Sequence, residues 1–209
     1  IDESMDFTAC READGVVYSN FVTDNYIVGQ KAAKYIAEKL GGEGKVAIVE
    51  GAAGNTTSQQ RTGGATDTWA EMDGIELVAS QPGDWDRMTS MDVASAMITA
   101  NPDLKAIYCC NDVEALGVTE AVINANKLGE ILVVGTDATA DGKNSIAKGE
   151  ETASVGQDNT GIGIESVKSA IEAVKAGFVP TDHIGDESYP AITYVDSFLV
   201  DSDNVADYK

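Results

Sequence analysis

The fold of this chain is decided by residues 106–117, which read AIYCCNDVEALG. Residues 106–110 are apolar throughout, which is typical of a strand buried on both faces of a sheet. Asn111 can then cap a helix over 112–126. The inward face of this helix consists of Ala115, Val118 and Val122. The stretch therefore predicts a strand that leads directly into a helix, which is the repeating unit of a parallel sheet.

The same unit repeats on both sides of this stretch. The spacing of apolar residues predicts further strands at 16–22, 45–50, 75–80, 131–136, 153–157 and 195–200. It predicts helices from Asp24 to Leu40 and over 58–72, 87–100, 141–148 and 160–176. Buried strands that alternate with helices predict an α/β fold, a doubly wound parallel sheet with helices on both faces. We expect the segment 178–194 to be irregular.

The charge balance excludes some classes of partner. The chain has 209 residues with 35 acidic and 14 basic side chains, a formal net charge of −21. A surface this negative repels phosphate backbones, so we expect no nucleic-acid partner. No apolar run approaches the roughly 20 residues that a membrane helix needs. Because the chain begins with Ile1, we expect any secretion signal or lipid anchor to lie upstream.

Residues that would support catalysis, a cofactor or a metal are scarce. The single histidine, His183, leaves a catalytic triad without a visible base. The loop GAAGNTTS at 51–58 lacks the lysine of a phosphate-binding loop, and DATADG at 137–142 lacks ligands that a calcium loop requires. We therefore expect no catalytic residue, no cofactor and no metal. Small buried thiols without a disulfide bridge are the expected state of the cysteines, which are Cys10, Cys109 and Cys110.

Polar and aromatic side chains follow the predicted strands at their carboxyl ends. In an open α/β sheet this is the edge at which ligands bind. The residues that we expect there are Gln59, Arg61, Trp85, Asn111, Asp137 and Gln157. Carboxylate, amide and guanidinium groups together satisfy hydroxyls that both donate and accept hydrogen bonds. An indole can stack on the C–H face of a pyranose. The set therefore predicts a site for a small polyhydroxylated molecule such as a sugar.

Each of these residues also has a purely structural interpretation. Asn111 and Asp137 stand where a helix cap belongs. Arg61 can pair with an acidic side chain of its own helix, at the surface. Trp85 can simply cover the edge of the sheet, and Gln157 can be a polar strand end. Coincidence at all of these positions is less probable than at any one of them.

Five segments, read together, resemble one family. They are GAAGNTTSQQRTGG (51–64), ASQPGDWDR (79–87), AIYCCNDVEALG (106–117), VVGTDATADG (133–142) and ASVGQDN (153–159). Their order and spacing are similar to those of periplasmic sugar-binding proteins of the ribose, galactose and allose type. The resemblance implies a Rossmann-like lobe of the type 1 periplasmic binding protein fold. In that family, two such lobes are joined by three hinge crossings and close around a sugar.

The resemblance also implies roles for individual residues. Asn111, Asp137 and Gln157 fall where the family has polar sugar ligands. Arg61 and Trp85 match the arginine and the stacking tryptophan of the galactose-binding members.

At four further positions the chain matches the family at one and departs from it at three. Asp2 resembles an aspartate of the N-terminal lobe. Glu3 and Gln59 stand where ribose-binding members have arginines, and Thr136 stands where they have an aromatic residue. These departures favour a hexose or another pyranose over ribose.

Only the later part of the family pattern is present, so most of the first lobe would precede Ile1. By analogy, residues 23–157 form the C-terminal sugar-binding lobe, and 195–209 add a final strand and a solvated acidic tail. Residues 1–22 are a remnant of the N-terminal lobe with a hinge crossing, and 158–194 hold another crossing and a helix of that lobe. This helix carries an apolar stripe of Ile164, Val167, Ile171 and Val174. We therefore expect a missing or separate N-terminal polypeptide that covers the stripe.

The implied function is that of the solute-binding component of an ABC-type sugar importer. Such a protein captures a monosaccharide by hinge closure and presents it to a membrane permease. We expect a location outside the cytoplasm, in the periplasm or lipid-anchored at the cell surface. One alternative is the effector-binding domain of a LacI-type transcription regulator, which the acidity disfavours. A second is a sugar-modifying α/β enzyme, for which no nucleophile and base are visible.

Overall fold

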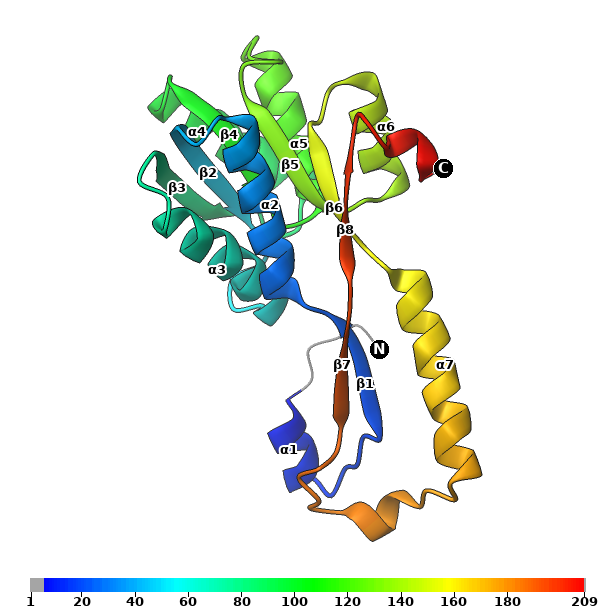
Figure 1. Ribbon diagram of the computed structural model, residues 1–209. Coiled ribbons are helices and arrows are strands. Elements are labelled where there is room, and N and C mark those ends of the chain that lie inside the picture. The colour runs from blue at the N-terminus through cyan, green and yellow to red at the C-terminus, as the bar shows by residue number, and fades with distance from the viewer. Residues whose placement is uncertain (1–5, 209) are drawn as a thin grey trace. The chain divides into compact units, whose positions relative to one another are not determined.

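The computed structural model describes residues 6–208 (Figure 1). The chain divides into two compact units, and it passes between them after Asp24, Gly156 and Ser197. Unit 1 comprises the described residues up to Asp24 together with Gln157–Ser197. Unit 2 comprises Asn25–Gly156 and the described residues from Phe198 onward.

A six-stranded sheet forms the centre of unit 2, in the order β3-β2-β4-β5-β6-β8. Its strands are β2 (Gly44–Glu50), β3 (Ile75–Pro82), β4 (Leu104–Cys109), β5 (Leu132–Asp137), β6 (Ala153–Gln157) and β8 (Ser197–Asp201). The pairs β2–β3, β2–β4, β4–β5 and β5–β6 are parallel. Continuous apolar runs place β2 and β4 in the interior, because both strands are buried along most of their length. The predicted doubly wound parallel sheet is confirmed.

The winding of the sheet reverses between β2 and β4. The chain leads from β2 outward to β3 and then returns to β4, on the other side of β2. In open α/β sheets ligands bind beyond the carboxyl ends of the strands at such a reversal. The ends of β2 and β4, at Glu50 and Cys109, therefore mark the edge at which a ligand is expected.

Helices cover both faces of this sheet (Figure 1). One face carries α2 (Asn25–Lys39) and α3 (Thr56–Ala70), and the other carries α4 (Arg87–Ala100) and α5 (Asp112–Asn124), which α6 (Ala140–Lys148) contacts. The core under α2 and α3 contains the largest buried side chains, Trp69 and Tyr108. The indole N–H of Trp69 donates to the carbonyl of Ala33 at 3.1 Å, so its polar group is satisfied inside the core.

Most helices of unit 2 begin at a residue whose side-chain oxygen accepts a backbone N–H. Asn55 caps α3, Asp86 caps α4, Asn111 caps α5 and Thr139 caps α6. Asn, Asp and Thr are the residue types that satisfy the orphan N–H groups of a first turn. The residue at which each of these helices begins is therefore determined by the local sequence.

Unit 1 is built around a two-stranded parallel sheet. Its elements are α1 (Phe7–Glu12), β1 (Ser19–Thr23), α7 (Asn159–Lys175), the 3₁₀ helix η1 (Pro180–His183) and β7 (Ala191–Val195). β1 pairs with β7, from Ser19 opposite Ala191 to Thr23 opposite Val195. The Ser19 and Ser169 hydroxyls lie 2.7 Å apart and connect β1 to α7.

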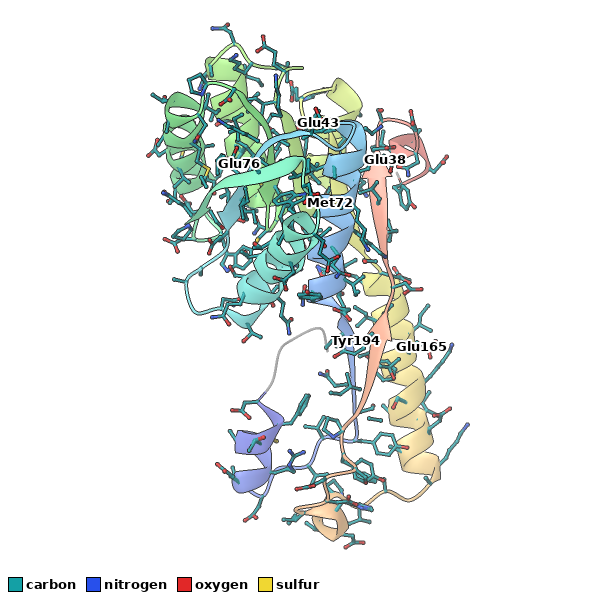
Figure 2. All side chains as sticks on the ribbon, turned by 60° about the vertical axis from the view of Figure 1, so that its left-hand side comes forward. Glu38, Glu43, Met72, Glu76, Glu165 and Tyr194 are labelled. Carbon is teal, nitrogen blue, oxygen red and sulfur yellow. The ribbon has the colours of Figure 1, made fainter. Side chains whose placement is uncertain are left out.

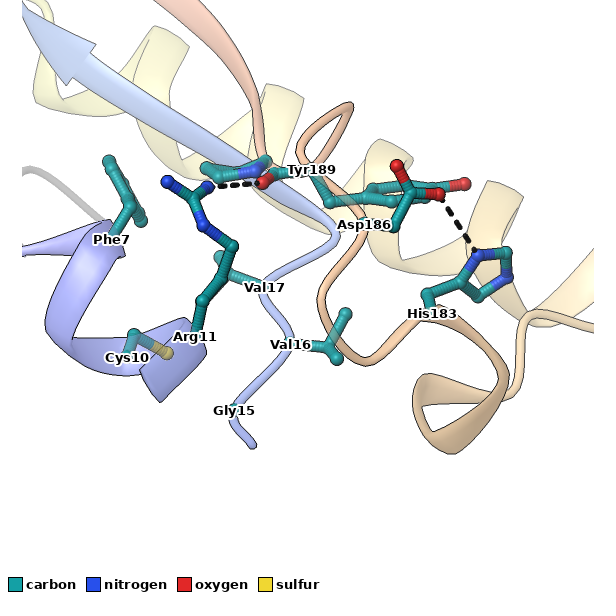
Figure 3. A pocket seen from close by; sticks show the side chains of 10 residues that line it. Phe7, Cys10, Arg11, Gly15, Val16, Val17, His183, Asp186 and Tyr189 are labelled. Atoms are coloured by element: carbon teal, nitrogen blue, oxygen red, sulfur yellow. Dashed lines mark hydrogen bonds and ion pairs between the residues drawn. The ribbon is translucent and has the colours of Figure 1, made fainter. Parts of the chain in front are cut away.

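Aromatic rings hold the segment between α7 and β7 in place. Phe178 stacks on His183 with ring centroids 4.6 Å apart, and both rings contact Tyr189. Tyr18, just before β1, packs edge-on against Phe178 at 4.8 Å. Figure 3 shows Arg11 of α1, whose Nη1 donates to the Tyr189 carbonyl at 3.2 Å. The segment that we predicted to be irregular is therefore ordered by ring contacts up to β7.

Three segments differ from the predictions. The polar opening stretch contains α1, which Asp6 caps by accepting from the N–H groups of Thr8 and Ala9. The predicted strand 195–200 is confirmed as β8, which begins two residues later and ends one residue later. β7 lies mostly in the segment predicted to be irregular, and it escaped prediction because most of its residues are exposed. The acidic tail is folded into η2 (Val205–Asp207), and Phe198 stacks on Tyr208 with ring centroids 4.8 Å apart.

The apolar stripe of α7 is exposed, as are apolar side chains of β7. Ile164, Val167 and Ile171 are about half exposed, and Val174 is 80% exposed. Figure 2 shows Tyr194 of β7, which is 62% exposed, and places Glu38, Glu43 and Glu76 on the surface of unit 2. Within residues 6–208, no helix is long and apolar enough to cross a membrane.

Candidate functional site

The buried side chain of Arg61 lies at the reversal point of the sheet. It reaches there from α3, and the residue is only 5% exposed. Its Nη1 donates to the carbonyl of Cys110 at 2.7 Å and to Asp137 Oδ1 at 3.3 Å, and its Nε donates to Asn25 Oδ1 at 2.9 Å. A buried guanidinium needs such partners, because an unpaired charge in the interior is strongly destabilising.

Pairing of Arg61 with an acidic residue of its own helix is therefore the wrong interpretation. The nearest such candidate on α3, Asp67, instead accepts from the Tyr26 hydroxyl at 2.8 Å. The structure brings Arg61 together with Asp137, which was predicted for the same edge from the end of a different strand.

Asp137 ends β5 in a backbone conformation that few residues adopt. Its φ is 106° and that of Ala138 is 49°, so the chain turns sharply at the strand end. The interpretation of Asp137 as a helix cap is wrong, because Thr139 Oγ1 accepts the Gly142 N–H at 3.1 Å and caps α6. The carboxylate of Asp137 is 31% exposed while its partner Arg61 is buried. It is thus the solvent-facing member of the pair.

Asn111 is a helix cap, as one structural interpretation predicted. Its Oδ1 accepts the Glu114 N–H at 2.8 Å, and Glu114 Oε2 accepts the Asn111 N–H at 3.2 Å, which completes a capping box. The cap uses the side-chain oxygen of Asn111, so its NH2 group is the part that can donate to a ligand.

Trp85 lies at the same edge in a strained backbone. Asp84 and Trp85 have φ values of 56° and 58°, and each left-handed non-glycine residue costs about 1–2 kcal/mol. The indole packs over Gly51, where an added β-carbon would lie 2.0 Å from Trp85 Cζ2. The ring therefore covers the end of β2, and it is partly exposed.

The remaining predicted residues are distributed differently. Gln59 is exposed on α3, two residues from the buried Arg61, so the two side chains lie on different faces of the helix. Gln157 belongs to unit 1, where its Oε1 accepts from the Thr23 hydroxyl at 3.2 Å. Asp2 and Glu3 lie outside the described residues. Thr136 is fully buried and contacts the hydroxyl of Tyr108 at 3.2 Å.

Three buried carboxyl groups lie behind this edge and were not predicted. Asp112 accepts from Ser154 and Thr139, yet burial raises its pKa to about 6. Burial raises the pKa of Glu114 to about 8, against two backbone N–H donors that lower it. Both residues looked like ordinary acids of a first helical turn, so only their burial distinguishes them.

The third buried carboxyl group is Glu151, whose oxygens have, among the described residues, only the backbone N–H of Gly135 nearby as a donor. Burial and the charge of Asp112 raise its pKa well above the usual range, and the nearby Gly135 N–H lowers it only in part. Gly135 lies between the two carboxyls, because a β-carbon there would be 2.6 Å from Asp112 Oδ1 and 2.7 Å from Glu151 Oε1. Burial at this position therefore favours the protonated form of Glu151 over the charged form.

In the part of the chain that the structure describes, no group of three or more His, Cys, Asp or Glu residues is arranged to hold a metal ion. The three cysteines are unbridged, as predicted. Cys109 and Cys110 are buried as expected, whereas Cys10 is only partly buried because it lies on α1, which has no buried residue.

The sequence matches the family model described as "Periplasmic binding protein domain" over residues 6–177. The chain is 47% identical to the D-allose-binding periplasmic protein of Escherichia coli K12 over 147 residues, which is 70% of this chain and 47% of that protein. It is 36% identical to the ribose import binding protein of the same organism over 132 residues, 63% of this chain and 44% of that one. The chain thus spans about half the length of these curated relatives.

Solved structures resemble nearly the whole chain. An ABC transporter periplasmic solute-binding protein from Actinobacillus succinogenes 130z, with bound D-allose, has 30% identity and a TM-score of 0.79. The match covers 99% of this chain and 70% of that one. The sugar-binding protein of a sugar ABC transporter from Bacillus halodurans has 26% identity and a TM-score of 0.84, covering 94% and 68% of the two chains.

Proposed function

Because this chain belongs to the periplasmic binding protein domain family, we propose that it captures a monosaccharide as part of the solute-binding component of an ABC-type sugar importer. The single observation that carries the proposal is the buried Arg61, which donates to Asp137 at the carboxyl edge of the sheet. A carboxylate held by an arginine offers sugar hydroxyls an acceptor of defined position.

An uncharged hexose or another pyranose is the proposed ligand. Asp137 compensates the charge of Arg61, so little positive charge is left to attract a phosphate or a carboxylate. The indole of Trp85 offers a flat apolar face beside the polar groups. The relative that is 47% identical is named for D-allose, a hexose, which supports this choice over ribose.

Hinge closure is the proposed mechanism of capture. We assign unit 2 to the C-terminal sugar-binding lobe, and unit 1 to hinge crossings and part of the N-terminal lobe. The three passages of the chain between the units support this assignment. Sugar docks first on unit 2, and the closed form is then recognised by a membrane permease.

Seven residues are proposed to contact the sugar. Arg61, Trp85, Asn111 and Asp137 contribute from unit 2. Gln59 and Gln157 are assigned to the same site from their position at the carboxyl ends of strands, and Asp2 is assigned to it by resemblance.

A further N-terminal polypeptide is proposed to complete the first lobe. The exposed stripe of α7 and the exposed side chains of β7 support it, because apolar patches of this kind usually mark an interface. The proposed location of the complete protein is outside the cytoplasm, with a signal or lipid anchor upstream of Ile1. Two rival functions, an effector domain of a LacI-type regulator and a sugar-modifying enzyme, are disfavoured by the net charge of −21 and by the scarcity of nucleophile–base pairs.

Native mass spectrometry with a panel of monosaccharides tests the proposed function. The chain is measured alone and with hexoses and pentoses, and a gain of one hexose mass is the expected result. The Asp137→Ala variant should lose that complex and keep its fold. Asp141→Ala is the matched control, because Asp141 is an exposed acid in the neighbouring helix α6. Unchanged binding by Asp137→Ala, or turnover of any sugar, would overturn the proposal.

A further inference from the structure

One buried carboxyl group connects two of the proposed sugar-contacting residues. Glu114 lies in the first turn of α5 and is fully buried. Its Oε1 accepts the backbone N–H of Trp85 at 3.0 Å, and its Oε2 accepts the backbone N–H of Asn111 at 3.2 Å. The bond to Asn111 is the local half of the capping box, whereas the bond to Trp85 spans 29 positions. Both oxygens of one side chain are thus engaged by two separate loops.

The loop before α4 leaves room for this carboxyl group. A β-carbon on Gly83 would lie 3.0 Å from Glu114 Oε1 and 2.6 Å from Val49 Cγ1, so only glycine leaves the space open. The Gly83 N–H donates to the Glu50 carbonyl at 2.6 Å and so ties the loop to the end of β2. Trp85 follows in the left-handed conformation, with its N–H directed at Glu114.

We propose that Glu114 is a positioning residue, which fixes the Trp85 ring and the Asn111 amide relative to each other for sugar binding. This inference rests on the proposed function. An acceptor with two oxygens holds both N–H groups at once, and no second acceptor in the described chain is bonded to the Trp85 N–H. Glu114 is expected not to touch the sugar, because its side chain is buried behind both residues.

The test uses two substitutions at Glu114. Glu114→Gln keeps the shape but turns one acceptor into an NH2 group, which opposes one of the two backbone donors. Glu114→Met removes both acceptors and leaves an apolar side chain of similar length, which suits a buried position. The Met variant keeps the test decisive if the Gln variant fails to fold. Glu120→Gln is the control, because Glu120 lies on the same helix and pairs with Arg87 at the surface.

Fluorine NMR of the 209-residue chain labelled with 5-fluorotryptophan provides the readout. The chain has two tryptophans, and buried Trp69 reports on the fold while Trp85 reports on the site. We expect the Trp85 resonance to move or broaden in both Glu114 variants, with the Trp69 resonance unchanged. The dissociation constant for hexose, from titration of the same signal, should rise roughly tenfold through loss of one hydrogen-bonding position. Glu120→Gln should match the wild type in both measurements.

Two results would overturn the inference. One is an unmoved Trp85 resonance in both Glu114 variants, and the other is a moved resonance with an unchanged hexose affinity. Absence of hexose binding to the wild-type chain would instead count against the proposed function. The Trp85 resonance of the variants still decides whether Glu114 holds this loop, so the two failures are distinguishable.

Discussion

Arg61 and Asp137 form an ion pair that links α3 to the end of β5, with Nη1 and Oδ1 3.3 Å apart. The arginine side chain is 6% exposed and the aspartate is 31% exposed, so the buried cation holds an anion that faces solvent. This geometry restrains the carboxylate at the carboxyl edge of the sheet, where it remains partly exposed.

Arg61→Lys should weaken hexose binding at least tenfold. A lysine ammonium cannot reproduce the planar fork that reaches Asn25, Cys110 and Asp137 together. A buried acceptor left unpaired costs about 1–3 kcal/mol, so the free energy of unfolding should fall by a similar amount. Calorimetric titration with hexose and urea denaturation measure the two effects. Arg87→Lys, at an exposed ion pair, is the control and should change neither. If Arg61→Lys bound hexose as tightly as Arg87→Lys, Arg61 would not belong to the binding site.

Gly51→Ala should displace the Trp85 ring, although the substitution replaces none of the side chains proposed to contact the sugar. The new methyl group would stand 2.0 Å from Trp85 Cζ2, so the indole must move or tilt. We expect hexose affinity to fall toward that of Trp85→Ala, with titration of tryptophan fluorescence as the measurement.

Gly63→Ala is the matched control for Gly51→Ala. A β-carbon at Gly63 meets no atom closer than 3.9 Å, and alanine in a helix interior is favoured over glycine by about 0.5–1 kcal/mol. This variant should bind as the wild type does and be slightly more stable. Normal affinity in both Gly51→Ala and Trp85→Ala would mean that Trp85 only covers the sheet edge.

Stability should decrease as pH rises from about 4 to about 8. Burial raises the pKa of Asp112 from 3.8 to about 6 and that of Glu114 from 4.5 to about 8. Between the unfolded and folded values the folded chain holds more protons than the unfolded chain, so stability falls as pH rises through this window. The total loss should be on the order of 8 kcal/mol if both groups ionise fully, since one pKa unit corresponds to about 1.4 kcal/mol. Urea denaturation at pH 5, 7 and 9 measures it.

Glu114→Gln provides the check on this pH dependence. The amide does not titrate, so the part of the slope between pH 6 and pH 8 should shrink in this variant. Glu130→Gln, at an exposed residue paired with Lys127, should keep the wild-type slope. A wild-type slope in Glu114→Gln would show that other groups carry the effect.

Val174→Asp should reduce the binding of a hydrophobic dye to the isolated chain. Val174 is the most exposed member of the α7 stripe, at 80%. An acid there interrupts the apolar surface at little cost in stability, because the residue is hardly packed. Fluorescence of bound dye measures the change, and Lys168→Asp on the polar face of α7 is the control. Equal dye binding by wild type and Val174→Asp would show that this stripe is not the exposed surface that the dye detects.

Local patterns in the amino-acid sequence were sufficient for most elements of unit 2. The strand at 153–157 and the helix at 87–100 have the predicted bounds, because apolar periodicity and caps such as Asp86 act within a few residues. The cap at Asn111 followed from the same local chemistry. Placement of polar residues at one edge followed from the rule that parallel strands end on the same side.

Contacts between distant segments were beyond the reach of such patterns. β7 exists through its pairing with β1, more than 150 residues earlier in the chain, and its own residues are mostly exposed. The burial of Glu114 and Glu151 has no local signal, because an acid in a first turn or a loop looks the same whether water or core surrounds it. Periodicity records which face of an element is apolar, whereas the partners of Arg61, Trp85 and Glu114 depend on how remote elements pack. The amino-acid sequence thus determined the helices and strands and the edge of the sheet at which a ligand is expected. The packing of remote elements determined which side chains meet at that edge.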